Sequence, residues 1–272
     1  MNSLRLLFLI ILLFISSSIY GQECSVNRIN FQPGETVTYR AVYNWGFIWV
    51  NAGDVVFSVS DTTYMNKPAF HFKALGWSLK RYDRFFKVRD RFESIVNPKT
   101  LQPYWFERDT YEGGFEVFNR YTFNRADSIV NIISQTSDRP FKMDEISLSN
   151  CTFDVLSAIY FCRTLDFDKY KKGDKIPLSM AIDDEVYDLY IRYQGKEEFE
   201  TRSGETFNTI RFSIMLVEGT IFRGGEDMFV WVTDDENRVP VMVEAKILIG
   251  SVKAVLTGME GLKHPNKAQV FK

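Results

Sequence analysis

The stretch CTFDVLSAIYFCRTL, residues 151–165, decides the predicted fold. In the helix that this segment would form, apolar side chains occupy nearly every side instead of a single stripe. Asn150 or Thr152 can cap its start, and Asp154 falls in the first turn, where the helix dipole favours a carboxylate. A helix without a polar face cannot lie on a surface, so we expect it to be buried.

Both flanks of this segment alternate apolar and polar residues with the period of a β-strand. Turn signals such as Pro33–Gly34 and Asp183–Asp184 separate the alternating runs. In the run Phe86–Ser94, three apolar residues share one side with Asp90 and Ser94, whereas the other side carries only charged residues. Strands of this kind are typical of an antiparallel sheet with one solvated face. We expect some ten strands in all.

The clearest hairpin runs from Tyr104 to Phe123, around the two-residue loop Gly113–Gly114. Its predicted register sets Phe106 opposite Tyr121 and Tyr104 opposite Phe123 on one face, and Glu107 opposite Arg120 on the other. Aromatic pairs and opposite charges are both favourable cross-strand neighbours. A slip of one residue would disrupt both sets together.

These elements predict a mainly β fold with one buried central helix. The economical arrangement is a strongly curved antiparallel sheet, a half-open barrel, wrapped around that helix, because the helix has no face for water. The alternative is a pair of stacked β-sandwich-like lobes that divide near residue 150, with the helix as their joint.

The N-terminus has the pattern of an export signal. Arg5 precedes the apolar run Leu6–Ile15, which is about half as long as a membrane-spanning helix, and Gly21 offers a small residue for cleavage. We therefore expect a signal peptide over residues 1–21, a single β-rich domain over 22–263 and a polar, frayed tail over 264–272. The expected location is the periplasm or the periplasmic face of the outer membrane, without a membrane-spanning segment.

Composition and cysteine content limit the function further. A formal net charge of −2 is not basic enough to favour nucleic acid as a partner.

On one continuous helix, Cys151 and Cys162 would lie roughly 16 Å apart along the axis, beyond the Cα separation of about 7 Å that a disulfide allows. Cys24 could pair with either of them, or all three could be buried thiols, which we favour slightly.

Several segments resemble the bacterial envelope family known as domain of unknown function 3108. They are Phe31–Glu35, Tyr43–Gly46, Val50–Gly53, Asp154–Tyr160 with Arg163, Val230–Asp235, Arg238–Val241 and Ile249–Val252. The resemblance implies an exported protein of a Gram-negative envelope and no assigned reaction. The predicted architecture is also similar to lipoprotein-carrier folds, in which a half-barrel leaves an apolar cavity for acyl chains, although a fold alone does not establish a function.

Aromatic residues are the candidate ligand-binding residues. The segment from Trp45 to Val50 is too apolar for an ordinary loop, so it either fills the barrel mouth as core, which we favour, or lines a pocket for an apolar ligand. The candidate set is Trp45, Phe47, Trp49, Trp77, Trp105, Phe106 and Tyr121.

A basic cluster interleaved with aromatic residues is the second candidate site. Its candidate anion-binding residues are Arg81, Arg84, Lys87 and Arg89. Outside the cytoplasm, an anionic lipid or a polysaccharide is the relevant partner. A solvated strand face is the ordinary explanation, which we favour because Asp83, Asp90 and Glu93 dilute the charge.

No catalytic, metal or cofactor motif is recognisable. His71 and His264 are too few for a zinc hydrolase or a histidine-based triad, and we expect His71 to be an exposed or hydrogen-bonded strand residue. The acidic segment Asp234–Asn237 lacks the spacing and the glycine of a helix–loop–helix calcium site, so we interpret it as a turn.

Three functions are consistent with these features. The first is a non-enzymatic carrier that holds a lipidic or other apolar ligand in the cavity of the curved sheet. The second is a structural or interaction module of an envelope assembly, which would have a filled core. The third, less favoured, is a glycan hydrolase with paired carboxylates in a polar cleft.

Overall fold

The computed structural model describes residue 26 and residues 28–45, 48–149, 151–217, 224–246 and 250–271, without the side chains of Trp45 and Ile48. The expected signal peptide and Cys24 therefore lie outside the described residues. The strands before the helix are β1 (Thr36–Trp45), β2 (Ile48–Tyr64), β3 (Lys67–Ser78), β4 (Val88–Val96), β5 (Pro103–Glu112), β6 (Phe115–Asn124), β7 (Ile129–Thr136), β8 (Lys142–Ser147) and β9 (Thr152–Phe153).

The α-helix α2 (Val155–Cys162) and the short 3-10 helix η1 (Phe167–Lys169) follow β9. The later strands are β10 (Lys175–Ile182), β11 (Glu185–Glu200), β12 (Thr206–Leu216), β13 (Gly225–Thr233), β14 (Pro240–Lys246), β15 (Ser251–Glu260) and β16 (Gln269–Val270). The chain is mainly β, as predicted.

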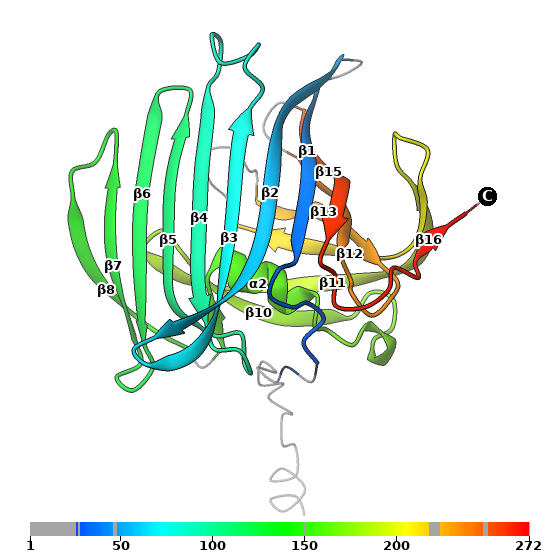
Figure 1. The fold of residues 1–272 in the computed structure, drawn as a ribbon. Coiled ribbons are helices and arrows are strands. Elements are labelled where there is room, and N and C mark those ends of the chain that lie inside the picture. The colour runs from blue at the N-terminus through cyan, green and yellow to red at the C-terminus, as the bar shows by residue number, and fades with distance from the viewer. Residues whose placement is uncertain are drawn as a thin grey trace, which may run out of the picture.

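All these strands form one open, curved, 16-stranded sheet. Its order is β8-β7-β6-β5-β4-β3-β2-β1-β15-β14-β13-β12-β11-β10-β9, and β16 pairs with β12. Only the short pairing of β9 with β10 is parallel. Figure 1 shows the first half of the sheet as a broad meander, with the later strands crossing it behind α2. The alternative of two stacked lobes is wrong, because β1 and β15 join both halves into one sheet.

The predicted helix exists, but it is shorter than the apolar segment. Thr152 and Phe153 are extended because they pair with Ser179 and Met180 of β10, and the helix begins only after Asp154. The expectation that Cys151 lies on this helix, and that Asn150 or Thr152 caps it, is therefore wrong.

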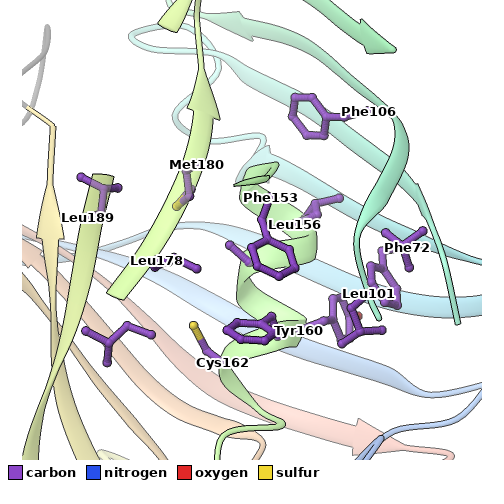
Figure 2. Packing of buried hydrophobic residues seen from close by; sticks show 14 of the residues in the cluster. Phe72, Leu101, Phe106, Phe153, Leu156, Tyr160, Cys162, Leu178, Met180 and Leu189 are labelled. Carbon is purple, nitrogen blue, oxygen red and sulfur yellow. The ribbon is translucent and has the colours of Figure 1, made fainter. Parts of the chain in front are cut away.

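The helix side chains are buried in the main hydrophobic core. α2 contacts β3 and β4 from one half of the sheet, and β9 and β10 from the other. Tyr160 stacks on Phe72 with ring centroids 3.9 Å apart, and Phe31 meets Tyr160 edge-on at 4.9 Å. Figure 2 shows Leu178 and Met180 on the side of the helix opposite Phe72. Side chains of the described residues thus pack against α2 from both halves of the sheet.

The hairpin of β5 and β6 has the predicted register. Phe106 lies opposite Tyr121 with ring centroids 5.3 Å apart, and Arg120 donates to Glu107 at 2.7 Å. Gly113 and Gly114 have φ values of 61° and 102°, which glycine adopts without steric cost. The prediction is confirmed for these two pairs.

Strands β7 and β8 extend the sheet beyond the predicted strands. The consecutive residues Ile132 and Ile133 interrupt the alternation of β7, and β8 is rich in charged residues. At the C-terminus, Ala268 is buried and β16 pairs with β12, so the expectation of a frayed tail is wrong for the described residues 264–271.

The cysteines differ from one another. Cys151 is buried and disulfide-bonded, whereas Cys162 is a buried free thiol. The interpretation of all three cysteines as thiols is therefore wrong. Burial raises the pKa of the Cys162 thiol to about 12, so this thiol is unreactive.

Candidate functional site

A small apolar slot lies where β1, β2, β14 and β15 meet the end of β11 and the loop after it. Its volume is about 190 Å³. The residues that line it are Val42, Trp49, Phe199, Glu200, Arg202, Met242, Lys253 and Val255. Neighbouring strands supply the walls, since Met242 pairs with Val255 and Val42 pairs with Lys253.

Two cations lie close to the tryptophan of this slot. The Arg202 guanidinium lies 5.1 Å from the Trp49 ring centroid, and the Lys253 ammonium lies 4.7 Å from it. Lys253 also pairs with Glu244 at 3.1 Å, whereas Arg202 forms no ion pair within the described residues. Trp49 itself is 43% exposed. An apolar group could enter the slot while an anionic head group remained beside Arg202 and Lys253.

A wider groove of about 500 Å³ runs along β3, β4 and β5. Its lining residues are Leu75, Gly76, Trp77, Arg89, Asp90, Arg91, Asp109 and Tyr111. Arg91 bridges Glu93 at 3.0 Å, Glu107 at 2.9 Å and Asp109 at 3.0 Å, so its donors are already engaged. The groove thus combines apolar residues such as Leu75 and Trp77 with an arginine whose charge is neutralised by neighbouring carboxylates.

The two carboxylates of this groove do not form a glycosidase pair. In the register of β4 and β5, Asp90 lies opposite Thr110, and Asp109 lies opposite Arg91. Side chains alternate between the faces of a sheet, so the Asp90 and Asp109 side chains leave opposite faces. Burial, aided by the nearby charge of Glu112, raises the pKa of Asp90 to about 7. Asp109 therefore cannot be the second catalytic carboxylate that a glycan hydrolase would need beside Asp90.

The basic cluster lies mainly in the loop between β3 and β4, not on a strand face. Arg89 is neutralised by Asp83, with Nη2 at 2.6 Å from Oδ2, and this hydrogen bond lowers the pKa of Asp83. Lys87 lies over the Tyr111 ring and Arg81 over the Tyr82 ring. Arg84 is exposed. The other three candidate cations, Arg81, Arg84 and Lys87, are exposed to solvent.

The predicted aromatic ligand-binding residues do not converge on one site. Phe106 and Tyr121 belong to the core, and Trp105 is half-buried on the opposite face of β5. Trp49 lines the slot and Trp77 the groove. The Trp45 side chain and Phe47 lie outside the described residues.

His71 is a hydrogen-bonded strand residue, as predicted, with Nε2 at 2.9 Å from Glu93 Oε2. Within the described ranges, no three His, Cys, Asp or Glu side chains gather in a way that could hold a metal ion. In the same part of the chain, no helix combines the length and apolar character needed to cross a bilayer.

A buried ion pair joins segments that are far apart in the sequence. Arg163 and Glu35 are only 3% and 1% exposed, and they form two parallel hydrogen bonds, one of them 3.0 Å between Nη2 and Oε2. Arg163 also donates to the carbonyl of Asn237 through Nε at 3.2 Å and Nη2 at 3.0 Å. The pair therefore ties the start of β1 to the end of α2 and to the turn before β14.

The same turn anchors the C-terminal segment. The Asn237 side chain donates to the carbonyl of His264 at 2.9 Å and accepts from its backbone N–H at 2.9 Å. Asp235 accepts hydrogen bonds from Thr233 Oγ1 and from the backbone N–H of Asn237 and Arg238. The acidic turn is thus structural, as predicted.

Asp154 is the N-cap of α2 and is fully buried. Its Oδ1 accepts from the backbone N–H of Leu156 at 2.8 Å and of Ser157 at 3.0 Å, and its Oδ2 accepts from Ser94 at 2.6 Å. Burial nevertheless raises the pKa of Asp154 from 3.8 to about 6, although these hydrogen bonds oppose the shift.

The raised pKa of Asp154 predicts a specific pH dependence of stability. Between pH 3.8 and about 6 the folded state holds a proton that the unfolded state has lost, so stability falls as pH rises through this window. Asp154→Asn removes this titration and keeps a capping side chain. Relative to the wild type, we expect the free energy of unfolding of the variant to rise by about 2.5 kcal/mol from pH 4 to pH 7. Urea titrations across this range measure the difference, and a constant difference would contradict the prediction.

A family model described as "Protein of unknown function (DUF3108)" matches residues 37–257, which is most of the chain. The chain belongs to the DUF3108 family. Of the buried ion pair, Arg163 lies within the matched region and Glu35 lies two residues before it. None of the curated proteins matches the chain.

The fold of this DUF3108 protein is similar to a crystal structure of a β-barrel-like protein of the domain of unknown function DUF1849 from Brucella abortus. The TM-score is 0.54 at 8% sequence identity, and the match covers 87% of this chain and 100% of the other. At this identity the likeness concerns the fold alone.

Proposed function

We propose that this DUF3108 protein is a non-enzymatic binding protein of the cell envelope that takes an anionic amphiphile at the slot around Trp49. The observation that supports it is the combination of apolar walls with two cations, Arg202 and Lys253, close to the Trp49 ring. A volume of about 190 Å³ lies below the usual range of drug-sized pockets, so the slot suits one end of a chain-like ligand. Fatty acids, phospholipids and glycolipids share this chemistry.

This proposal moves the ligand away from the site expected from sequence. We infer that the sheet curves around α2 from both sides, as a half-open barrel does, but that its interior serves stability. Tyr160, Phe72 and Phe31 already fill the space beside the helix. A ligand that entered there would have to displace core side chains.

Export to the envelope is part of the proposal. The charged and apolar pattern of residues 1–15 favours it, and so does the disulfide-bonded Cys151, because disulfides persist in oxidising compartments. We propose the periplasm or the periplasmic face of the outer membrane as the location.

The slot predicts how single substitutions change ligand binding. Met242→Trp places a large ring in the slot and should weaken binding of parinaric acid, a fluorescent fatty acid, by tenfold or more, about 1.4 kcal/mol. Arg202→Gln should weaken binding of the acid by about threefold to tenfold but leave parinaryl alcohol unaffected, because only the acid carries the charge. Fluorescence titration measures both effects.

Lys172→Gln is the control, since Lys172 is also an exposed cation but does not line the slot. Saturable binding that Met242→Trp leaves unchanged would exclude the slot as the site. Organic extraction of protein purified from its native envelope should release a bound amphiphile, and its absence would count against a carrier.

A structural or interaction module is the second candidate, and the filled core around α2 favours it. In that case, cross-linking in the native envelope would capture a protein partner and parinaric acid would not bind. The groove that contains Asp90 and Asp109 does not support a glycan hydrolase, because the register of β4 and β5 directs these two side chains to opposite faces of the sheet.

A further inference from the structure

The large hydrophobic side chains that the described residues expose are concentrated along one edge of the sheet. The edge comprises the β3–β4, β5–β6 and β7–β8 connections together with the adjoining first residues of β2 and β15, and the three connections lie along the upper edge in Figure 1. We call it the hairpin rim. It carries Trp49, Trp77, Phe85, Phe86, Phe115, Phe141, Met143 and Val252, and only Met65 and Phe271 among such exposed residues lie elsewhere.

The strand registers confirm that these connections lie on one side. Trp77 pairs with Arg89, Val88 with Glu112, and Glu112 with Phe115. Further along, Val117 pairs with Thr136, and Ser134 with Lys142. The opposite edge differs, because its turn between β4 and β5 buries Leu101 completely, and Met65 is its one exposed large hydrophobic residue in the described ranges.

The β3–β4 loop projects most strongly from this rim. Phe85 is 85% exposed, the same fraction as the terminal Phe271. Phe86 is half-exposed, and its ring lies over Gly113 so closely that a side chain at Gly113 would collide with it. The loop is therefore supported by the neighbouring hairpin while Phe85 remains uncovered.

The charge of the same loop indicates what covers these side chains. Lys80, Arg81, Arg84 and Lys87 are exposed around Phe85 and Phe86. The one carboxylate of the loop, Asp83, is already paired with Arg89. On the β7–β8 connection, the exposed Arg139 lies close in sequence to Phe141, whereas Lys142 at the start of β8 is already paired with Asp144. Aromatic residues at the level of the head groups, surrounded by cations, are the pattern by which proteins bind the surface of an anionic bilayer.

We propose that the hairpin rim docks on an anionic lipid surface, with Phe85 and Phe86 inserted at the level of the head groups and the loop cations on the lipid phosphates. The proposal does not rest on the amphiphile slot. It assigns the protein an orientation, with the β2–β3 turn at the far end from the membrane.

Co-sedimentation with lipid vesicles tests the proposal. The full chain should bind vesicles that contain phosphatidylglycerol far more strongly than pure phosphatidylcholine vesicles, and high salt should weaken the binding. Phe85→Ala should lower the partition coefficient about tenfold or more, because an inserted phenylalanine contributes most of its apolar area. Arg81→Gln with Arg84→Gln should lower it by about tenfold as well.

Met65→Ala is the matched control, since Met65 is 77% exposed but lies at the opposite edge. It should leave the partition coefficient unchanged. Failure to bind either type of vesicle, or binding insensitive to Phe85→Ala, overturns the proposal. Light scattering that instead detects dimers dependent on Phe85 would overturn it in favour of a second copy on the rim. Met242→Trp should weaken fatty-acid binding tenfold or more without changing vesicle binding, which separates this test from that of the slot.

Discussion

Replacement of Arg163 by methionine is expected to lower the free energy of unfolding by about 3–5 kcal/mol, which is a large part of the stability of an ordinary domain. The substitution leaves Glu35 buried without a cation and the Asn237 carbonyl without its donor. Glu35→Gln removes the opposite charge and should have a comparable effect. Chemical denaturation measures both, and thermal midpoints should fall by about 10 °C or more.

Two further variants make the explanation specific. The double variant with Glu35→Leu and Arg163→Met removes both charges, so it should be less destabilised than either single variant. Lys169→Met, which breaks an exposed pair with Asp166, should cost less than about 1 kcal/mol. If Arg163→Met behaved like Lys169→Met, the pair would not be buried as described.

Tyr160→Ala should destabilise the protein by about 3–5 kcal/mol, because it opens a cavity between α2 and the sheet. The ring of Tyr160 is in contact with Phe72 and Phe31, and the Arg163 guanidinium lies 5.5 Å from its centroid. Equilibrium unfolding in urea measures the loss.

Tyr160→Phe is the matched control, since it retains the ring and removes only the hydroxyl group, and it should cost far less. Equal losses for the two variants would show that the hydroxyl, rather than ring packing, matters. A negligible loss for Tyr160→Ala would mean that α2 lies outside the core, and the architecture would then be wrong.

Local features of the fold could be predicted from sequence because one turn or one alternation specifies them. The two glycines at 113 and 114 set the register of their hairpin, and that register brought Glu107 to Arg120. The apolar composition of residues 151–165 predicts a buried helix, but it does not predict that the helix begins only after Asp154. Pairing of Thr152 with Ser179 is a non-local contact, which no pattern within the segment reveals.

The candidate site depended on contacts of still longer range. The sequence marks Trp49 as an aromatic residue in an apolar segment, but Arg202 and Lys253 carry no local signal that would link them to it. Glu35, Arg163 and Asn237 also lie in separate parts of the chain. Only the resemblance to a family draws attention to Arg163 and Glu35, and the fold alone shows that they pair.

The neighbourhood of β1 and β15 fixes when the molecule can finish folding. Thr36 lies opposite Glu260, so β1 cannot complete its pairing until β15, which is synthesised much later, is available. Contacts of such high sequence separation form slowly. A chain truncated before residue 251 would contain the meander from β2 to β8 but would leave one edge of β1 unpaired. The two halves of the sheet would then not be joined by hydrogen bonds between β1 and β15.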